Sequence, residues 1–224
     1  DTFLETLEKE KYYSMHTIQN YRRDLRQFHR FYAGQNLKSL SDFDHSLCRN
    51  YLNELFNKGY AKPSIARHIA SCRSFWNYLL SQNMTGQNPW RHLKAPKPDK
   101  PLPTILSEAE MATFLDQLKT DTPQGQRDKL IYELLYSTGM RVSELVSLEL
   151  SNIDLESKEC RIMGKGKKER IVFFTNLVHE QLLRYLESTR PKWNKAQKNA
   201  IFLSQRGQRL SVRTIQRNLK KALI

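Results

Sequence analysis

This sequence has little cysteine and no long apolar run. Its three cysteines, Cys48, Cys72 and Cys160, are odd in number and widely scattered, so they match neither a disulfide framework nor the spacing of a metal site. No apolar stretch approaches the ~20 residues that a membrane-spanning helix needs, and no charged-then-apolar leader is visible. These absences exclude a disulfide-rich secreted module and lead us to expect a cytoplasmic protein with no membrane span.

Positive charge is what the sequence has in excess, and it gathers at one end. The chain has 37 Lys and Arg residues against 23 Asp and Glu, a formal net charge of +14. Residues 161–224 carry 16 basic and 3 acidic side chains, whereas residues 101–160 carry 5 and 11. This balance indicates a polyanionic partner, because each neutralised phosphate releases condensed counterions. A well-solvated basic surface is the alternative.

A proline-rich stretch divides the chain. Four prolines between residues 94 and 103 cannot continue a helix, and they favour an extended, semi-rigid connector. We therefore expect an N-terminal domain over residues 1–94, a linker over residues 95–103 and a second domain over residues 104–224. The predicted fold class is mainly α, with an all-helical first domain and an α+β second domain that contains a small β-hairpin sheet.

Apolar residues at three- and four-residue steps predict the helices of the first domain. Arg22 and Arg23 fall off the apolar stripe of the first helix, and Arg67, His68 and Ser71 fall off that of the third. A helix with such a basic and small-polar exposed face can enter a major groove, whereas a plain amphipathic helix with a solvated back is the alternative. The expected helices cover residues 17–31, 44–57 and 63–81.

Local signals predict the elements of the second domain. Ser107 followed by Glu110 forms a capping box at the start of a helix, Gly139 breaks the next helix, and Ser211 caps the last. Two short apolar runs on either side of a Gly-rich tip predict a hairpin. The expected helices cover residues 107–118, 124–137, 141–150, 176–188 and 211 onward, and the expected strands cover residues 159–163 and 170–174.

Two candidate sites stand out in the second domain. Arg141 opens a helix, where free N–H groups favour a phosphate, and Glu144 lies close enough on the same face to orient its guanidinium. An ordinary surface ion pair is the alternative. Residues 164–170 read GKGKKER, and the glycines of this hairpin tip allow close approach to a ligand while its basic side chains suit a phosphate or minor-groove contact. A solvated basic run is the alternative there.

Together the two sites fit a phosphodiester exchange. Its charge-rich transition state needs cations aimed at the non-bridging oxygens, and Arg141 supplies a bidentate fork. The departing sugar oxygen needs a proton, which Lys165 can deliver as a general acid. Because Arg141 and Lys165 lie on different elements, they can converge on one phosphorus.

In this order and at this interval the two motifs resemble those of the tyrosine site-specific recombinases, the phage integrase family, and most closely its Xer type. The resemblance covers essentially the whole chain. It includes a Thr17, Tyr21, Leu25 pattern in the first helix, the Pro-rich linker and residues 106–110. Residues 153–163 look more like XerC than XerD sequences, although this distinction is a weak one.

The resemblance implies a reaction and a role for each matching residue. The family cuts and rejoins DNA through a 3′-phosphotyrosine, without metal or cofactor, as in chromosome dimer resolution. Arg141 matches the arginine that clamps the scissile phosphate, Lys165 matches the lysine that protonates the 5′-oxygen, and Glu144 matches a supporting acid. A core-binding, SAM-like N-terminal domain and the hairpin would hold the DNA. The expected DNA-binding residues are Arg22, Arg23, Lys62, Ser64, Arg67, His68, Ser71, Lys167, Lys168 and Arg170.

The resemblance also implies partners. It predicts double-stranded DNA at a dif-like site, a tetramer on that DNA, a XerD-like partner recombinase and an FtsK-type translocase.

The sequence departs from the family pattern, which the resemblance implies to include a His-x-x-Arg box, a later His or Trp and a tyrosine nucleophile. None of the six histidines is followed by arginine three residues on, and the last tyrosine, Tyr185, falls inside the helix after the hairpin, where a packing role is expected. We therefore expect no nucleophile in these 224 residues, which would be a C-terminally truncated recombinase that binds DNA without cleaving it. The alternatives are a non-catalytic DNA-binding or decoy protein with a recombinase-like fold and, less favoured, a basic adaptor for protein partners.

Overall fold

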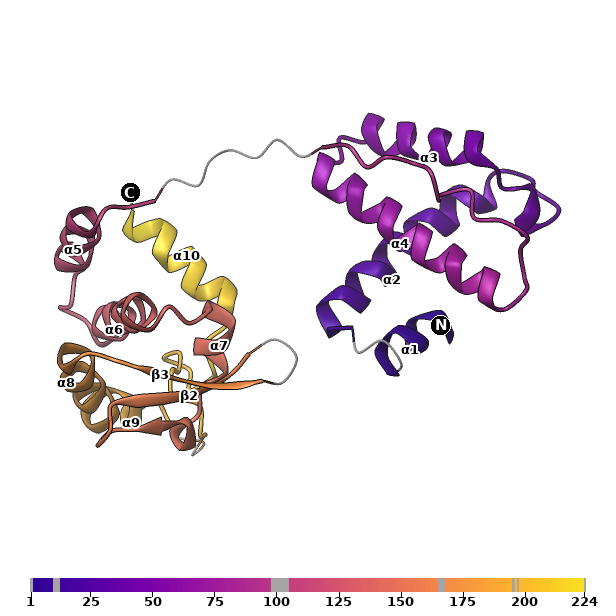
Figure 1. The fold of residues 1–224 in the computed structure, drawn as a ribbon. Coiled ribbons are helices and arrows are strands. Elements are labelled where there is room, and N and C mark those ends of the chain that lie inside the picture. Colours follow the sequence, from indigo (N-terminus) through magenta and orange to yellow (C-terminus); the bar gives the residue numbers. More distant parts are fainter. Residues whose placement is uncertain are drawn as a thin grey trace. The chain divides into compact units, whose positions relative to one another are not determined.

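The computed structural model describes residues 2–9, 13–97, 105–164, 168–194, 196 and 198–223. The chain divides into two compact units, residues 1–103 and 104–224 (Figure 1). Each unit has its own hydrophobic core. The predicted fold class, mainly α with a small sheet in the second unit, is confirmed. Within the described ranges, every helix is too short or too polar to cross a membrane.

Every secondary-structure element that the structure describes in the first unit is helical. Two of its helices have side-chain caps at their N-termini. The Ser14 hydroxyl accepts the N–H of Thr17, and the Asp44 carboxylate accepts the N–H of Leu47. The three predicted helices are confirmed, and α1 is an additional helix that the sequence analysis did not predict. The helices are α1 (Thr2–Lys9), α2 (Met15–Ala33), α3 (His45–Asn57) and α4 (Lys62–Ser81), with a 3₁₀ turn at Leu40–Asp42.

An aromatic cluster holds α2, α3 and α4 together. The ring of Phe28 on α2 makes edge contacts with Phe43, Tyr51, Trp76 and Trp90, at centroid separations of 5.1 to 5.7 Å. All five side chains are buried. Edge-to-face aromatic pairs add about 0.5–1.5 kcal/mol each beyond area burial, so this cluster fixes how α2 crosses α4.

The second unit packs helices around a three-stranded antiparallel sheet of order β1-β2-β3 (Figure 1). The predicted hairpin is confirmed, with Met163 opposite Glu169 next to its tip. The two-residue strand β1 was not predicted. The elements are α5 (Glu108–Gln117), α6 (Pro123–Thr138), α7 (Val142–Ser147), β1 (Ile153–Asp154), β2 (Glu159–Met163), β3 (Glu169–Phe173), α8 (Asn176–Arg184), a π-helical segment (Tyr185–Thr189), α9 (Arg190–Trp193) and α10 (Val212–Ala222).

Two predicted helices end elsewhere because of tertiary contacts. The helix expected over residues 141–150 stops at Ser147, because the Leu148 carbonyl accepts the N–H of Ile201 and the Leu150 N–H donates to Asn199. The helix expected to end at residue 188 continues instead as the π-helical segment and α9. There the side chain of Arg190 donates to the carbonyl of Ala200. Neither contact is local in sequence, which is why spacing alone did not reveal it.

Gly139 sets the direction of the chain before α7. It adopts φ 61°, in the left-handed region that favours glycine, and its N–H donates to Leu135 at the end of α6. A side chain at this position would strain the turn. The chain therefore leaves α6 sharply and places Arg141 immediately before α7.

Candidate functional site

Arg141 stands at the start of α7 with its side chain largely in solvent. The side chain is 66% exposed, and its Nη1 donates to Glu144 Oε1 at 3.0 Å. The backbone N–H of Arg141 donates to the other oxygen of the same carboxylate at 2.7 Å. The predicted pairing is confirmed: Glu144, three residues on, fixes both the backbone and the guanidinium of Arg141.

A second arginine binds the same carboxylate from the sheet. Arg170 on β3 donates from Nη1 to Glu144 Oε1 at 3.0 Å and from Nη2 to Oε2 at 2.8 Å. Glu144 is buried, and the Arg170 hydrogen bonds, with those from Arg141, lower the pKa of its carboxyl to about 2. One carboxylate thus joins α7 to the hairpin.

Gly164 makes room for this pairing at the base of the hairpin. Its N–H donates to the Lys168 carbonyl at 2.8 Å and closes the tip. A Cβ at Gly164 would lie 3.2 Å from Nη1 of Arg170 and 3.3 Å from the Lys168 carbonyl oxygen, tighter than ordinary contact. The glycine therefore permits the Arg170 guanidinium to reach Glu144.

The tip of the hairpin is only partly covered by the structure. Lys165, Gly166 and Lys167 lie outside the described residues, so the convergence of Lys165 with Arg141 and the DNA contact of Lys167 stay predictions. Lys168 is exposed, as a DNA-contacting side chain must be. Arg170 was also expected to contact DNA. Two of its five N–H donors bind Glu144 and its side chain is 39% exposed, so it supports that carboxylate and its contact with DNA stays a prediction.

This group of side chains is suited to hold a phosphate. The group carries a positive charge on each of Arg141 and Arg170 and a negative charge on Glu144, so one positive charge is in excess. The exposed member is Arg141, whose guanidinium keeps most of its five N–H donors outside the bond to Glu144. A guanidinium held on one side and open on the other presents a prearranged fork to an oxyanion.

The low pKa of Glu144 predicts acid sensitivity of the second unit. Because its folded-state pKa lies near 2 and the ordinary glutamate pKa lies higher, its charge stabilises the fold above the ordinary pKa, and this stability is lost as pH falls towards 2. We expect the free energy of unfolding, measured in urea, to fall more steeply between pH 5 and pH 2.5 in the native chain than in Glu144→Gln. Glu180→Gln, at an exposed position, is the charge-matched control and should retain the native slope. Parallel pH profiles for the native chain and Glu144→Gln would contradict the assignment.

The predicted DNA-binding residues of the first unit divide into two groups. Arg22 and Arg23 on α2 and Lys62 on α4 are exposed, and Ser64 and Arg67 on α4 are partly buried. These five can reach a ligand from the surface of the unit.

The expectation that His68 and Ser71 lie on an exposed face is wrong. Their exposures are 1% and 0%, because α4 is buried on a second side where it crosses α2. There the Ser71 hydroxyl donates to Asp24 Oδ2 at 3.3 Å, and His68 Nε2 lies 3.3 Å from Asp24 Oδ1. Polar side chains usually face outward, but here a buried carboxylate on the neighbouring helix holds these two side chains inside.

Tyr185 has the packing role that its position predicted. It is buried, its hydroxyl donates to the Ile201 carbonyl at 3.2 Å, and the same oxygen accepts the N–H of Leu203 at 3.2 Å. Burial raises the pKa of this phenol. The Tyr185 hydroxyl thus donates one hydrogen bond and accepts another inside the fold, so it is not presented to a substrate.

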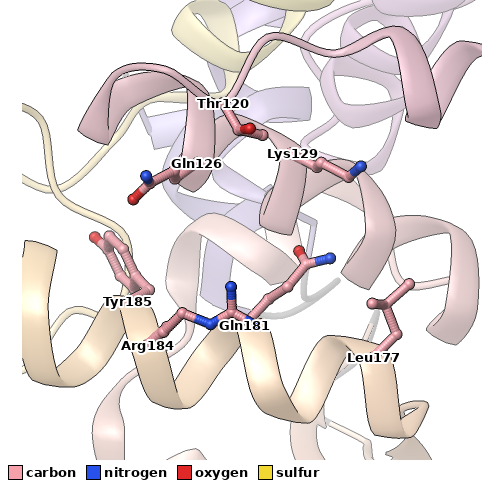
Figure 2. Close-up of a pocket in the computed structure, with 7 residues that line it drawn as sticks. All are labelled: Thr120, Gln126, Lys129, Leu177, Gln181, Arg184 and Tyr185. Carbon is pink, nitrogen blue, oxygen red and sulfur yellow. The ribbon is translucent and has the colours of Figure 1, made fainter.

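A hollow of about 290 Å³ lies between α6 and α8. None of the predicted site residues that the structure describes lines it, so it is separate from the Arg141 group. Gln181 Oε1 is buried there and has no hydrogen-bond partner in the described part of the chain. Figure 2 shows the lining from the α6 side, Thr120, Gln126 and Lys129, and from the α8 side, Leu177, Gln181, Arg184 and Tyr185.

Two functional contacts escaped the sequence analysis. The bond between Arg170 and Glu144 joins residues 26 positions apart and leaves no local pattern. Asp24 did leave a signal, because it follows Tyr21 by three residues and precedes Phe28 by four, which places a carboxylate in the apolar stripe of α2. A charged residue in a buried stripe needs a partner, and that requirement could have pointed to it.

Family models match both units. Residues 104–224 match the model of the phage integrase family, and residues 1–83 match the model of the phage integrase N-terminal SAM-like domain. Among the described residues there is no group of His, Cys, Asp and Glu side chains that could hold a metal ion.

Curated relatives cover nearly the whole chain. A tyrosine recombinase XerC of Halalkalibacterium halodurans is 35% identical over 226 residues, covering 99% of this chain and 75% of that protein. A tyrosine recombinase XerC of Staphylococcus carnosus is 40% identical over 194 residues, covering 87% of this chain and 65% of that protein. A tyrosine recombinase XerD of Staphylococcus aureus is 36% identical and covers 99% of this chain and 75% of that protein. The chain thus spans a little under two thirds of the Staphylococcus carnosus relative.

Solved structures share the fold. A crystal structure of XerH site-specific recombinase bound to a palindromic difH substrate, in a post-cleavage complex, matches with a TM-score of 0.73 at 20% identity, covering 97% of this chain and 66% of that chain. A crystal structure of a lambda integrase dimer bound to a COC′ core site matches with a TM-score of 0.71 at 19% identity, covering 99% of this chain and 76% of that chain.

Proposed function

Because this chain belongs to the phage integrase family, as a tyrosine recombinase of the Xer type, we propose that it is the DNA-binding and partial catalytic portion of a recombinase that resolves chromosome dimers. The observation that carries the proposal is the Glu144 carboxylate, which holds Arg141 open to solvent at the base of a basic hairpin. This is the arrangement that a phosphoryl-transfer site needs, because the cation is fixed before the oxyanion arrives.

Each residue of the site has a proposed role. Arg141 clamps the non-bridging oxygens of the scissile phosphate, Lys165 protonates the leaving 5′-oxygen, and Glu144 supports Arg141. Residues 1–94 form the core-binding domain, residues 95–103 the linker and residues 104–224 part of the catalytic domain. The exposed basic residues of α2 and α4, with those of the hairpin, contact the DNA backbone.

The partners are proposed for the whole protein. The chain covers 65% of one curated relative and 75% of another, and we propose that strand exchange needs a longer protein that carries the nucleophilic tyrosine. We propose that it acts in the cytoplasm as a tetramer on a dif-like site, with a XerD-like partner and an FtsK-type translocase. The XerH structure bound to difH and the DNA complex of the lambda integrase dimer support assembly on DNA.

The 224 residues are expected to bind duplex DNA without forming a covalent adduct, because Tyr185 is the last tyrosine of the sequence and its hydroxyl is buried in the fold. The measurement is a suicide-substrate assay, read by denaturing gel, beside a binding isotherm at low salt. A covalent adduct would contradict the assignment of the nucleophile. Absence of any DNA affinity at low salt would overturn the proposed function and favour the adaptor.

A non-catalytic DNA-binding protein is the second candidate. The observation in its favour is that no histidine of this sequence has an arginine three residues on. The codons downstream of residue 224 separate the two candidates. A His-x-x-Arg box followed by a tyrosine supports the enzyme, and a stop codon supports the binding protein.

A further inference from the structure

A buried carboxylate holds the crossing of α2 and α4. Asp24 on α2 has no exposed surface. Its Oδ2 accepts Nε of Arg67 at 2.9 Å and its Oδ1 accepts Nη2 of Arg67 at 2.9 Å, a bidentate pair between helices. The Ser71 hydroxyl lies 3.3 Å from Asp24 Oδ2 and 3.1 Å from the His68 carbonyl, and these two acceptors share its one hydrogen. A charge buried this completely is stable only when its lone pairs are satisfied, so Asp24 and Arg67 depend on each other.

His68 and Tyr51 extend the network into the core. His68 Nε2 lies 3.3 Å from Asp24 Oδ1, and His68 Nδ1 lies 2.9 Å from the Tyr51 hydroxyl. Burial lowers the pKa of His68, which favours the neutral ring. In that form Nδ1 accepts the Tyr51 hydroxyl, and Nε2 faces the Asp24 carboxylate. The Asp24 carboxylate therefore contacts the buried His68 as well as the partly exposed Arg67.

The other end of the Arg67 guanidinium reaches the surface. Its side chain is 34% exposed and lines a hollow of about 550 Å³. Two of its five N–H donors bind Asp24, which leaves three outside that pair. The hollow has a strongly basic lining. Four further arginines, all of them exposed and all on α2, contribute to it: Arg22, Arg23, Arg26 and Arg30.

We propose that Asp24 is a positioning residue for DNA binding: it locks Arg67 in one orientation so that the remaining N–H donors meet a backbone phosphate. The inference rests on the proposed function, since it assumes that this basic face meets DNA. A free arginine side chain must lose rotamer freedom when it binds a phosphate. Arg67 has lost that freedom on folding, so its contact with a phosphate is stronger than those of the four arginines around it, which form no ion pair with any residue that the structure describes.

The proposal predicts an effect opposite in sign to simple electrostatics. Asp24→Asn removes a negative charge beneath a DNA-binding face, which by Coulomb attraction alone would strengthen binding. Asparagine cannot hold the guanidinium with two charge-assisted bonds, so we expect duplex affinity to fall several-fold instead. The measurement is fluorescence anisotropy with the 224-residue chain and a random-sequence duplex at fixed salt. Glu8→Gln, an exposed charge-matched change in the same unit, should leave affinity unchanged or raise it.

A double-mutant cycle distinguishes positioning from a purely structural role. Arg67→Gln should weaken binding and lower the slope of log affinity against log salt by about one contact. Adding Asp24→Asn to Arg67→Gln should cost no further affinity, because the residue to be positioned is gone. If Asp24 only held the two helices together, the second change would cost as much as it does in the native chain.

A charge-conserving variant, Arg67→Lys, tests the inference if circular dichroism shows that Asp24→Asn does not fold. Arg67→Lys keeps the charge but cannot form the bidentate pair, so it should also bind DNA several-fold more weakly. Native affinity in Arg67→Lys, or affinity equal to or above native in a folded Asp24→Asn, overturns the inference while leaving DNA binding in place. Failure of the native chain to bind the duplex overturns the proposed function and the inference together.

Discussion

Alanine in place of Arg141, introduced into the protein encoded by the complete reading frame, is expected to slow DNA cleavage by about 100- to 1,000-fold, the usual cost of removing one preorganised oxyanion donor. The guanidinium is held by Glu144 and open to solvent, so its loss removes the contact to the phosphate. The fold should survive, because Arg170 still satisfies both oxygens of Glu144. Single-turnover cleavage of a nicked substrate is the measurement.

Two comparisons make this result specific. Arg161→Ala removes an exposed arginine from the same unit, and it should leave the cleavage rate within about twofold of native, as for a surface side chain with no part in the reaction. DNA affinity should stay close to native in Arg141→Ala, because one contact among many is lost. Native-like cleavage in Arg141→Ala would refute the clamp role.

Alanine in place of Lys165 should slow cleavage by about 100- to 10,000-fold, the range for loss of a general acid. In the proposed step the oxygen of a deprotonated tyrosine bonds to phosphorus, the bond from phosphorus to the 5′-oxygen breaks, and the lysine proton goes to that oxygen. A 5′-thio substrate leaves as a thiolate that needs no proton. The rate of Lys165→Ala on the 5′-thio substrate should therefore recover most of the loss.

Lys168→Ala is the matched control for Lys165. Lys168 belongs to the same basic tip and is exposed, so its loss should weaken DNA binding without changing the ratio of rates on 5′-thio and natural substrates. If the 5′-thio substrate fails to restore cleavage in Lys165→Ala, that lysine does not supply the proton.

Features fixed by neighbours in sequence were predictable. Ser107 and Glu110 form the capping box at α5, Ser211 caps α10, and Gly139 ends α6, each through contacts within four residues. The same holds for the bond from Arg141 to Glu144. In these places the local backbone conformation and the nearest side chain decide the structure, and both can be read from spacing.

Features fixed by distant partners were not predictable in the same way. Asp24 meets Arg67 43 positions away, and this pair turned His68 and Ser71 inward. The helix α1 is short, and its Leu7 is buried among residues of α2 and α4 such as Ile18 and Phe75. An eight-residue helix gains little from propensity alone and depends on such packing, so its own sequence gives a weak signal.

Because Glu144 binds both Arg141 and Arg170, few single substitutions at these three positions can be tolerated. Loss of the glutamate alone would leave Arg141 and Arg170 facing each other as like charges, and loss of Arg170 alone would leave a buried acid with half its partners. A side chain at Gly164 would crowd the same guanidinium. Substitutions at these positions are therefore epistatic: an evolutionary path that changes one must change another nearly at once, and libraries that randomise them singly will recover few active clones.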